Sequence, residues 1–144
     1  ARASIQGMTR GTTSAHIARA ALEGIAFQVA DMLGAMQADT GATLTSLKVD
    51  GGASANALLM QLQADLLGVR LVRPENLEST AVGCASLAGL AVKVWRDRDE
   101  LTALTTASAE FMPQPDDGTL ARRARQWARA VERSRNWVDI DTTP

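Results

Sequence analysis

The sequence predicts an α/β fold in which helices pack on a small sheet, and three observations support this prediction. A strand-like segment, a helical segment and a second strand-like segment follow one another between residues 44 and 74. Helical periodicity extends over residues 12–41 before this unit, and a basic amphipathic segment follows at 119–137. Apolar residues make up 46% of the 144 residues and charged residues 22%, which is enough for one globular, soluble domain with its own core.

The first predicted element is a long helix over residues 12–41. Thr12, Thr13 and Ser14 offer hydroxyls that can cap its N-terminus, and Gly41 follows as a C-terminal stop. Apolar residues recur within it at helical spacing, and we expect them to form one stripe that faces the core. These residues are Ile17, Ala21, Ile25, Val29, Met32, Leu33 and Met36.

The next three elements form a βαβ unit. Residues 44–50 alternate as a strand in which Leu47 and Val49 face the same side, and residues 69–74 form a second strand that stops at Pro74. The intervening segment "ANALLMQLQADLLG" predicts a helix that ends at Gly68. This succession predicts a parallel pair of strands with a right-handed crossover. The residues expected to face inward on the helix are Leu58, Leu59, Leu62 and Leu66.

A third helix is predicted over residues 79–95, capped by Ser79 or Thr80. One of its faces carries only small side chains, which would let the helix backbone approach a sheet or another helix closely. These are Ala81, Ala85, Ala88, Gly89 and Val92.

The chain turns polar after Trp95, and "FMPQPDDG" reads as a loop before the terminal helix over 119–137. Trp127, Val131 and Trp137 are expected on the inner face of that helix. Its arginines are expected on a solvated face.

Composition excludes several function classes. With 15 basic and 16 acidic residues the net charge is −1, so no strong field draws the chain to nucleic acid. No apolar run is long enough to cross a bilayer, and no signal-peptide pattern is present. A single cysteine, Cys84, fits a cytoplasmic location. The chain starts at Ala1 within an alternating apolar segment, and we expect it to be a piece of a longer protein.

The segment "DGGASAN", Asp50 to Asn56, lies where the first strand leads into the second helix. Two glycines permit unusual backbone angles and leave no side chain to obstruct a flat ligand. Ligands in open α/β sheets bind beyond the carboxyl ends of the strands, beside helix N-termini. Asn56 adds a donor and an acceptor in the first turn of the helix. These residues suit either a nucleotide site or a tight structural turn, and neither a Walker loop nor a dinucleotide fingerprint is present.

The segment "VDGGASANALLMQLQADLLGVRLVRPENLESTAVGCASLAGLAVKVW" resembles the C-terminal signature of the FGGY family of carbohydrate kinases. The upstream "GMTRGTTSAHIARAALEGIAFQVADML" and the ending "RRARQWARAVERSRNW" are similar to that family too, most of all to its glycerol-phosphorylating members. The resemblance extends from about Gly7 to Trp137. It implies an actin-like, ribonuclease H-like ATPase fold with two domains around a cleft. Residues 1–144 would be the last part of the second domain, with 138–144 as a disordered tail.

The resemblance also implies a site. Gly51, Gly52 and Ala53 match the turn that lies against adenosine in these kinases, and Asn56 matches the asparagine near the adenine and ribose. The implied reaction transfers the γ-phosphoryl group of Mg-ATP to glycerol, giving glycerol 3-phosphate. The catalytic aspartate, the glycerol-binding groups and the phosphate loops would lie upstream of Ala1. No catalytic residue or Mg²⁺ ligand is therefore assigned to this chain, and by itself it is expected to be inactive as a kinase.

Two alternatives stay open at this point. Another kinase of the same family would act on a pentulose or a similar polyol. A non-catalytic, actin-like nucleotide-binding module would keep only the fold. We also expect self-association, because the apolar stripes of the first and third helices are not fully covered by so short a chain.

The remaining chemistry-bearing residues receive structural roles. Asp50 is expected to accept hydrogen bonds from the turn amides, and Glu78 to place its charge at a helix N-terminus. His16 has no companion at metal-ligand spacing. Three residues depart from the family pattern. Cys84 is expected to be a small buried hydrophobe, Ser86 stands where tyrosine is typical, and Lys93 stands where glycine is usual.

Overall fold

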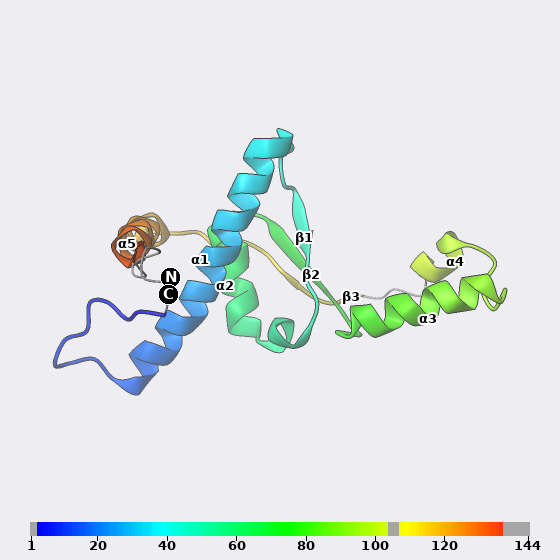
Figure 1. Cartoon of the computed structure of the whole chain (residues 1–144), viewed down its shortest axis with the longest axis horizontal. Helices are drawn as coiled ribbons and strands as arrows, with labels where there is room; N and C mark the ends of the chain where they lie inside the picture. The colour runs from blue at the N-terminus through cyan, green and yellow to red at the C-terminus, as the bar shows by residue number, and fades with distance from the viewer. Residues whose placement is uncertain (1–2, 104–106, 137–144) are drawn as a thin grey trace, which may run out of the picture.

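The computed structural model describes residues 3–103 and 107–136. Trp137 and the predicted tail at 138–144 lie outside the described residues. Helices alternate with short strands along the chain (Figure 1). No helix in the described ranges is long and apolar enough to cross a membrane. The elements are α1 (Ser14–Thr40), β1 (Ser46–Lys48), the 3-10 turn η1 (Gly52–Ala55), α2 (Ala57–Leu67), β2 (Arg70–Pro74), α3 (Ser79–Ala91), α4 (Arg98–Ala103), β3 (Ala107–Phe111) and α5 (Thr119–Ser134).

The sheet has three strands in the order β1-β2-β3. β1 and β2 are parallel, with Leu47 opposite Leu71, and this confirms the predicted pairing. β3 runs antiparallel to β2 with Phe111 opposite Leu71, and sequence analysis did not predict it. β2 is therefore the central strand, and its Leu71 side chain is fully buried. The expected alternation in β1 is also present, because Leu47 is half-buried while Lys48 is exposed.

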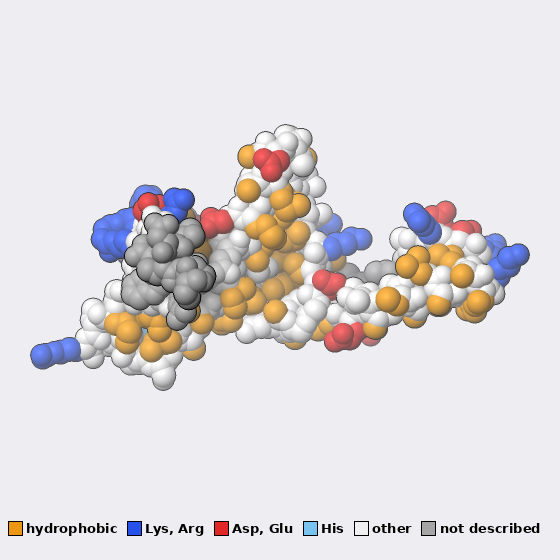
Figure 2. All heavy atoms as spheres, viewed as in Figure 1, with side chains coloured by type: hydrophobic (Ala, Val, Ile, Leu, Met, Phe, Trp, Pro, Cys, Tyr) orange, Lys and Arg blue, Asp and Glu red, His pale blue; other side chains and the backbone are white. Residues whose placement is uncertain are grey.

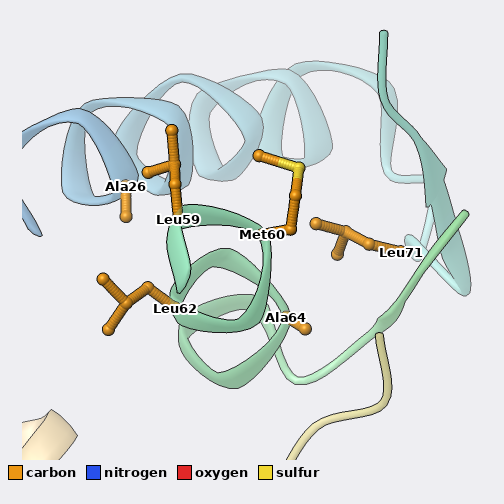
Figure 3. Packing of buried hydrophobic residues seen from close by; sticks show 6 residues of the cluster. All are labelled: Ala26, Leu59, Met60, Leu62, Ala64 and Leu71. Carbon is orange, nitrogen blue, oxygen red and sulfur yellow. The ribbon is translucent and has the colours of Figure 1, made fainter. Parts of the chain in front are cut away.

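The core forms where α2 packs between α1 and the sheet (Figure 3). It contains the buried residues Ala26, Leu59, Met60, Leu62, Ala64 and Leu71. Two of the four leucines predicted to face inward on α2, Leu59 and Leu62, are buried, and Leu66 packs against the cluster. Leu58 does not, since 46% of its surface is exposed. Burial of α2 on two sides fixes the helix whose N-terminus carries the glycine bend.

The predicted stripe on α1 is largely wrong. Leu33 is buried as predicted, but Ile25, Met32 and Met36 are exposed. Ala26 and Phe27, which were not part of the predicted stripe, are buried. Apolar residues occur on several sides of this helix, so helical spacing alone did not identify the face that meets α2. The helix ends are as predicted, because Thr13 caps the N-terminus and Gly41 ends the helix with φ 66°. His16 completes the cap, since its Nδ1 accepts a hydrogen bond from the Thr13 amide at 3.1 Å.

α3 and α4 project from the body as an arm (Figure 1). The N-cap position of α3 is Glu78, not Ser79 or Thr80 as predicted, and the helix ends at Ala91, earlier than predicted. Gly89 is its single buried residue, so the small-residue face does not pack on the sheet within the described chain. Cys84 is exposed, which corrects the prediction that it is buried. Figure 2 shows hydrophobic side chains gathered on the surface of this arm.

α5 packs against α1 through aromatic rings. Trp127 stacks on Phe27 with ring centroids 5.6 Å apart, and its indole Nε1 donates to Asp31 at 2.7 Å. Trp127 therefore faces inward as predicted, whereas Val131 is exposed. Two aspartates hold the start of the helix. Asp116 accepts from the Leu120 amide, and hydrogen bonds from Thr119 lower the pKa of the Asp117 carboxyl.

Lys93 has φ 63°, in the left-handed region. It lies at the C-terminal end of α3, where the Val94 amide donates to the Gly89 carbonyl at 2.8 Å and the Lys93 amide to Leu90 at 3.2 Å. These two bonds form a Schellman motif, in which the left-handed position is usually glycine. The structure thus gives the physical reason why lysine is the unusual residue here.

We predict that Lys93→Gly stabilises the end of α3. Removing the strain of a left-handed lysine should contribute about 1 kcal/mol. The amide of Val94 should then exchange with solvent about fivefold more slowly in hydrogen–deuterium exchange measured by NMR. Lys93→Ala is the control, because it removes the side chain and keeps the strained Cβ. Equal protection in both variants would contradict the explanation.

Candidate functional site

The candidate site is the bend between β1 and α2. Gly51 has φ 78°, a conformation that favours glycine, and Gly52 begins the 3-10 turn. The Gly51 amide donates to the Leu77 carbonyl at 2.9 Å, which ties the bend to the segment that precedes α3. The Gly51 carbonyl accepts from the amide of Ser54 at 3.0 Å and from its hydroxyl at 2.7 Å. Ser54 is buried, with 1% of its surface exposed, so its hydrogen bonds anchor the bend to the interior of the protein.

The outer side of the bend is open. A Cβ atom built on Gly51 or on Gly52 would have no atom within 4 Å. Gly52 and Ala53 are exposed, and Gly51 is half-buried. The backbone of the bend is anchored by the buried Ser54 and carries no side chain at its two glycines. A flat ring can therefore lie against it, as the sequence suggested.

Asn56 is the N-cap of α2, one residue before the helical turn in which it was predicted. Its Oδ1 accepts a hydrogen bond from the Leu59 amide at 3.1 Å. The Nδ2 group makes no hydrogen bond within the described part of the chain, and the residue is exposed. Asn56 thus offers an amide donor beside the bend while its oxygen stabilises the helix.

Arg73 supports the bend, and sequence analysis did not single it out. It comes from β2, and its guanidinium donates to the carbonyls of Ser54 at 3.0 Å and Ala55 at 3.4 Å. The same guanidinium lies 5.5 Å from the centre of the Phe111 ring. A cation that binds the last carbonyls of a short helical turn favours that turn electrostatically. The only signal in the sequence was a basic residue in a strand that leads toward the bend.

The geometry corrects the predicted role of Asp50 and agrees with the predicted position of Glu78 at a helix N-terminus. Asp50 accepts no hydrogen bond from the described residues, because the Gly51 amide is directed to Leu77 instead. Glu78 precedes α3 as predicted but makes no capping hydrogen bond with its side chain. The Asn76 side chain accepts from the Glu78 amide at 2.9 Å instead.

The bend is an open surface and does not line a cavity of about 1040 Å³ that lies between α3, α4 and the segment after β2. The lining of that cavity includes Leu77, whose carbonyl binds the Gly51 amide, so the two features are adjacent. Within residues 3–103 and 107–136, no group of three or more His, Cys, Asp or Glu residues could hold a metal ion. The described residues therefore do not form a magnesium site of their own.

Comparison with known proteins places the sequence in a family. Residues 1–92 match the C-terminal domain of the FGGY family of carbohydrate kinases. The chain is 58% identical over 139 residues to the glycerol kinase of Dechloromonas aromatica (strain RCB), covering 96% of this chain and 28% of that protein. It is 55% identical over 143 residues to the glycerol kinase of Rhodopirellula baltica, covering 99% of this chain and 26% of that protein. The chain thus spans about a quarter of the length of these relatives.

Solved structures agree with this placement. The crystal structure of Plasmodium falciparum glycerol kinase with ADP matches with a TM-score of 0.79 and 37% identity, covering 97% of this chain and 28% of that one. A ligand-bound xylulose kinase from Lactobacillus acidophilus matches with a TM-score of 0.72 and 25% identity, covering 94% of this chain and 27% of that one. The predicted α/β fold is confirmed, and its structural neighbours are sugar kinases with the expected actin-like architecture. The chain belongs to the FGGY family of carbohydrate kinases.

Proposed function

We propose that this chain supplies the adenosine-binding portion of a kinase that transfers the γ-phosphoryl group of ATP to glycerol. The observation that carries the proposal is the bare main chain at Gly51 and Gly52, beside the free amide donor of Asn56. It lies after the carboxyl end of a parallel strand, where α/β folds bind ligands. An ADP-bound glycerol kinase among the structural neighbours supports a nucleotide as the ligand.

The described residues have a binding role in this proposal. Gly51, Gly52 and Ala53 would present main chain to the adenosine, and Asn56 would donate to the adenine or the ribose. ATP with Mg²⁺ would supply the transferred group, and the metal would be held through the phosphates and by residues outside this chain. Proton abstraction from the acceptor hydroxyl is likewise assigned to no residue of this chain.

Glycerol is the proposed acceptor because the two relatives compared above are glycerol kinases, at 55% and 58% identity. A pentulose kinase is the second candidate, supported by the xylulose kinase structure at 25% identity. The difference in identity favours glycerol.

A non-catalytic module that keeps only the fold is a third candidate, and the nucleotide experiments below distinguish it. Self-association and a cytoplasmic location stay predictions.

We predict that Gly52→Val weakens ATP binding and leaves the fold intact. Apart from its chain neighbours, a Cβ built on Gly52 has no atom within 4 Å, so the protein has room for a side chain there, and valine would stand on the face that adenosine would cover. The dissociation constant for ATP should rise at least about tenfold, which is about 1.4 kcal/mol of binding free energy. NMR shifts of the Gly51 and Ala53 amides during an ATP titration would measure it. Gly34→Val is the matched control, because Gly34 is exposed on α1 with equally open space.

Measurable ATP binding that moves none of the bend amides, or that is equally strong in Gly52→Val and the unaltered chain, would exclude the bend as the nucleotide site. In that case the non-catalytic module that does not use this turn is the better description.

We also predict that Asn56→Ser separates helix capping from ligand binding. Serine caps helices about as well as asparagine, so the far-UV circular dichroism should be unchanged. Serine lacks the Nδ2 donor, and loss of one hydrogen bond should weaken ATP binding by about three- to tenfold. Asn56→Asp is the second variant, because it keeps the cap and replaces the donor by a charged acceptor. Affinity for ATP that is insensitive to both changes would remove Asn56 from the site.

A chimera tests the proposed function as a whole. The matching 139 residues of the Dechloromonas aromatica glycerol kinase would be replaced by this chain. We expect glycerol-dependent ADP release in a coupled assay from the chimera, none from the 144-residue chain by itself, and strong loss in the chimera carrying Gly52→Val. Turnover by this chain alone, or a folded but inactive chimera, would overturn the proposal. Restoring the segments expected upstream of Ala1 and then comparing glycerol with D-xylulose as the acceptor would decide between the two kinases.

A further inference from the structure

A second cavity of about 480 Å³ lies between α1, α5 and the start of the described chain. It is separate from the bend, because none of the proposed nucleotide-binding residues lines it. Its volume falls within the range that small-molecule sites usually have. Glu23 and Phe27 contribute from α1, and Arg123, Trp127, Arg129 and Arg133 contribute from α5.

The aromatic part of the lining is rigid. Phe27 is buried at 7% exposure and stacks on Trp127 with an angle of 12° between the rings. The Trp127 indole is held by its hydrogen bond to Asp31 at 2.7 Å. Packed rings and a held indole form a preorganised surface, so a ligand need not order it on binding.

The charges around this surface are unbalanced. Glu23 already accepts from two guanidinium groups, Arg19 at 2.8 Å and Arg123. Arg129 and Arg133 have no carboxylate partner within the described ranges. The cavity is lined by three arginines and one carboxylate, so its lining carries a net charge of +2. The net charge of the whole chain, in contrast, is −1. A concave surface with such an excess attracts anions.

Spacing on α5 explains how these arginines come together. Arg122, Arg125, Arg129 and Arg133 follow each other at intervals of three and four residues, so they lie along one side of the helix. Arg129 and Arg133 line the cavity, and Arg122 and Arg125 do not. Positive side chains cluster around α5 on the molecular surface (Figure 2). Guanidinium groups bind oxyanions in a planar, two-pronged manner, and phosphate is a preferred partner.

We propose that the cavity between α1 and α5 binds a small phosphate-bearing molecule, with Arg129 and Arg133 as the groups that hold the phosphate. Gln126, which also lines the cavity, would serve polar groups on the rest of the ligand. The site is independent of the proposed nucleotide site, so either one can be present without the other.

The test is an NMR titration of the 144-residue chain at constant ionic strength. Inorganic phosphate is one probe and glycerol 2-phosphate the other, so free phosphate and an organic phosphate ester are distinguished. We expect saturable shifts of the Trp127 indole and of the Arg129 and Arg133 Nε–H signals with at least one probe. Arg129→Gln with Arg133→Gln should weaken binding about tenfold or more, because two charge-assisted contacts are lost.

Arg122→Gln with Arg125→Gln is the matched control. It removes the same charge from the same helix outside the cavity, and affinity should fall by no more than about twofold. A third pair, Arg129→Lys with Arg133→Lys, keeps the charge and should recover part of the binding. Circular dichroism and the Trp127 indole position show whether each variant keeps the α1–α5 contact. No saturable shift with either probe, or equal loss in the cavity pair and the control pair, would overturn the proposal.

Discussion

The burial of α2 between α1 and the sheet is the constraint on which the rest of the structure depends. Ala64 and Leu71 have no exposed surface, and Leu59 has 2%, so α2 and β2 are fixed relative to each other. Buried packing of this kind accounts for most of the stability of a small domain. Because α2 is fixed, its first residue is fixed too, and Asn56 and the bend occupy one defined place at the edge of the sheet. The candidate site is therefore rigid through packing that lies beneath it.

The bend itself is held by hydrogen bonds that leave its outer side unused. Leu77 binds the Gly51 amide, and Arg73 binds the carbonyls of Ser54 and Ala55. None of these partners brings an atom within 4 Å of a Cβ built on Gly51 or Gly52. Asn56 is arranged in the same way. Its Oδ1 accepts the capping hydrogen bond of α2, and its Nδ2 remains available as a donor. Hydrogen bonds within the protein thus hold the bend in place, and its exposed backbone stays available for a ligand.

Sequence patterns predicted those parts of the fold that local chemistry determines. Caps, alternation and periodicity predicted both ends of α1, the end of α2 at Gly68, the parallel pairing of β1 with β2 and the inward Trp127. The missed parts depend on distant contacts. β3 contains little alternation of large apolar residues, and it is a strand because β2 offers it a free edge. Arg73 was missed for the same reason, since only the fold brings it to the bend.

The wrong burial predictions for α3 share one cause. Periodicity indicates which residues can face a partner, but it does not show whether that partner is present. α3 has no charged residue between Ser79 and Ala91, yet Gly89 is its single buried position, and Cys84 is exposed with it. An uncharged helix exposed in this way leaves apolar surface in water, which is unfavourable. The relatives are about four times as long as this chain, so in them the remaining sequence is available to cover such a face. The glycine bend is held by Leu77, in the segment before α3, and by Arg73 of β2, all within this chain. Its geometry therefore does not depend on that cover, and it is the sounder basis for a functional proposal.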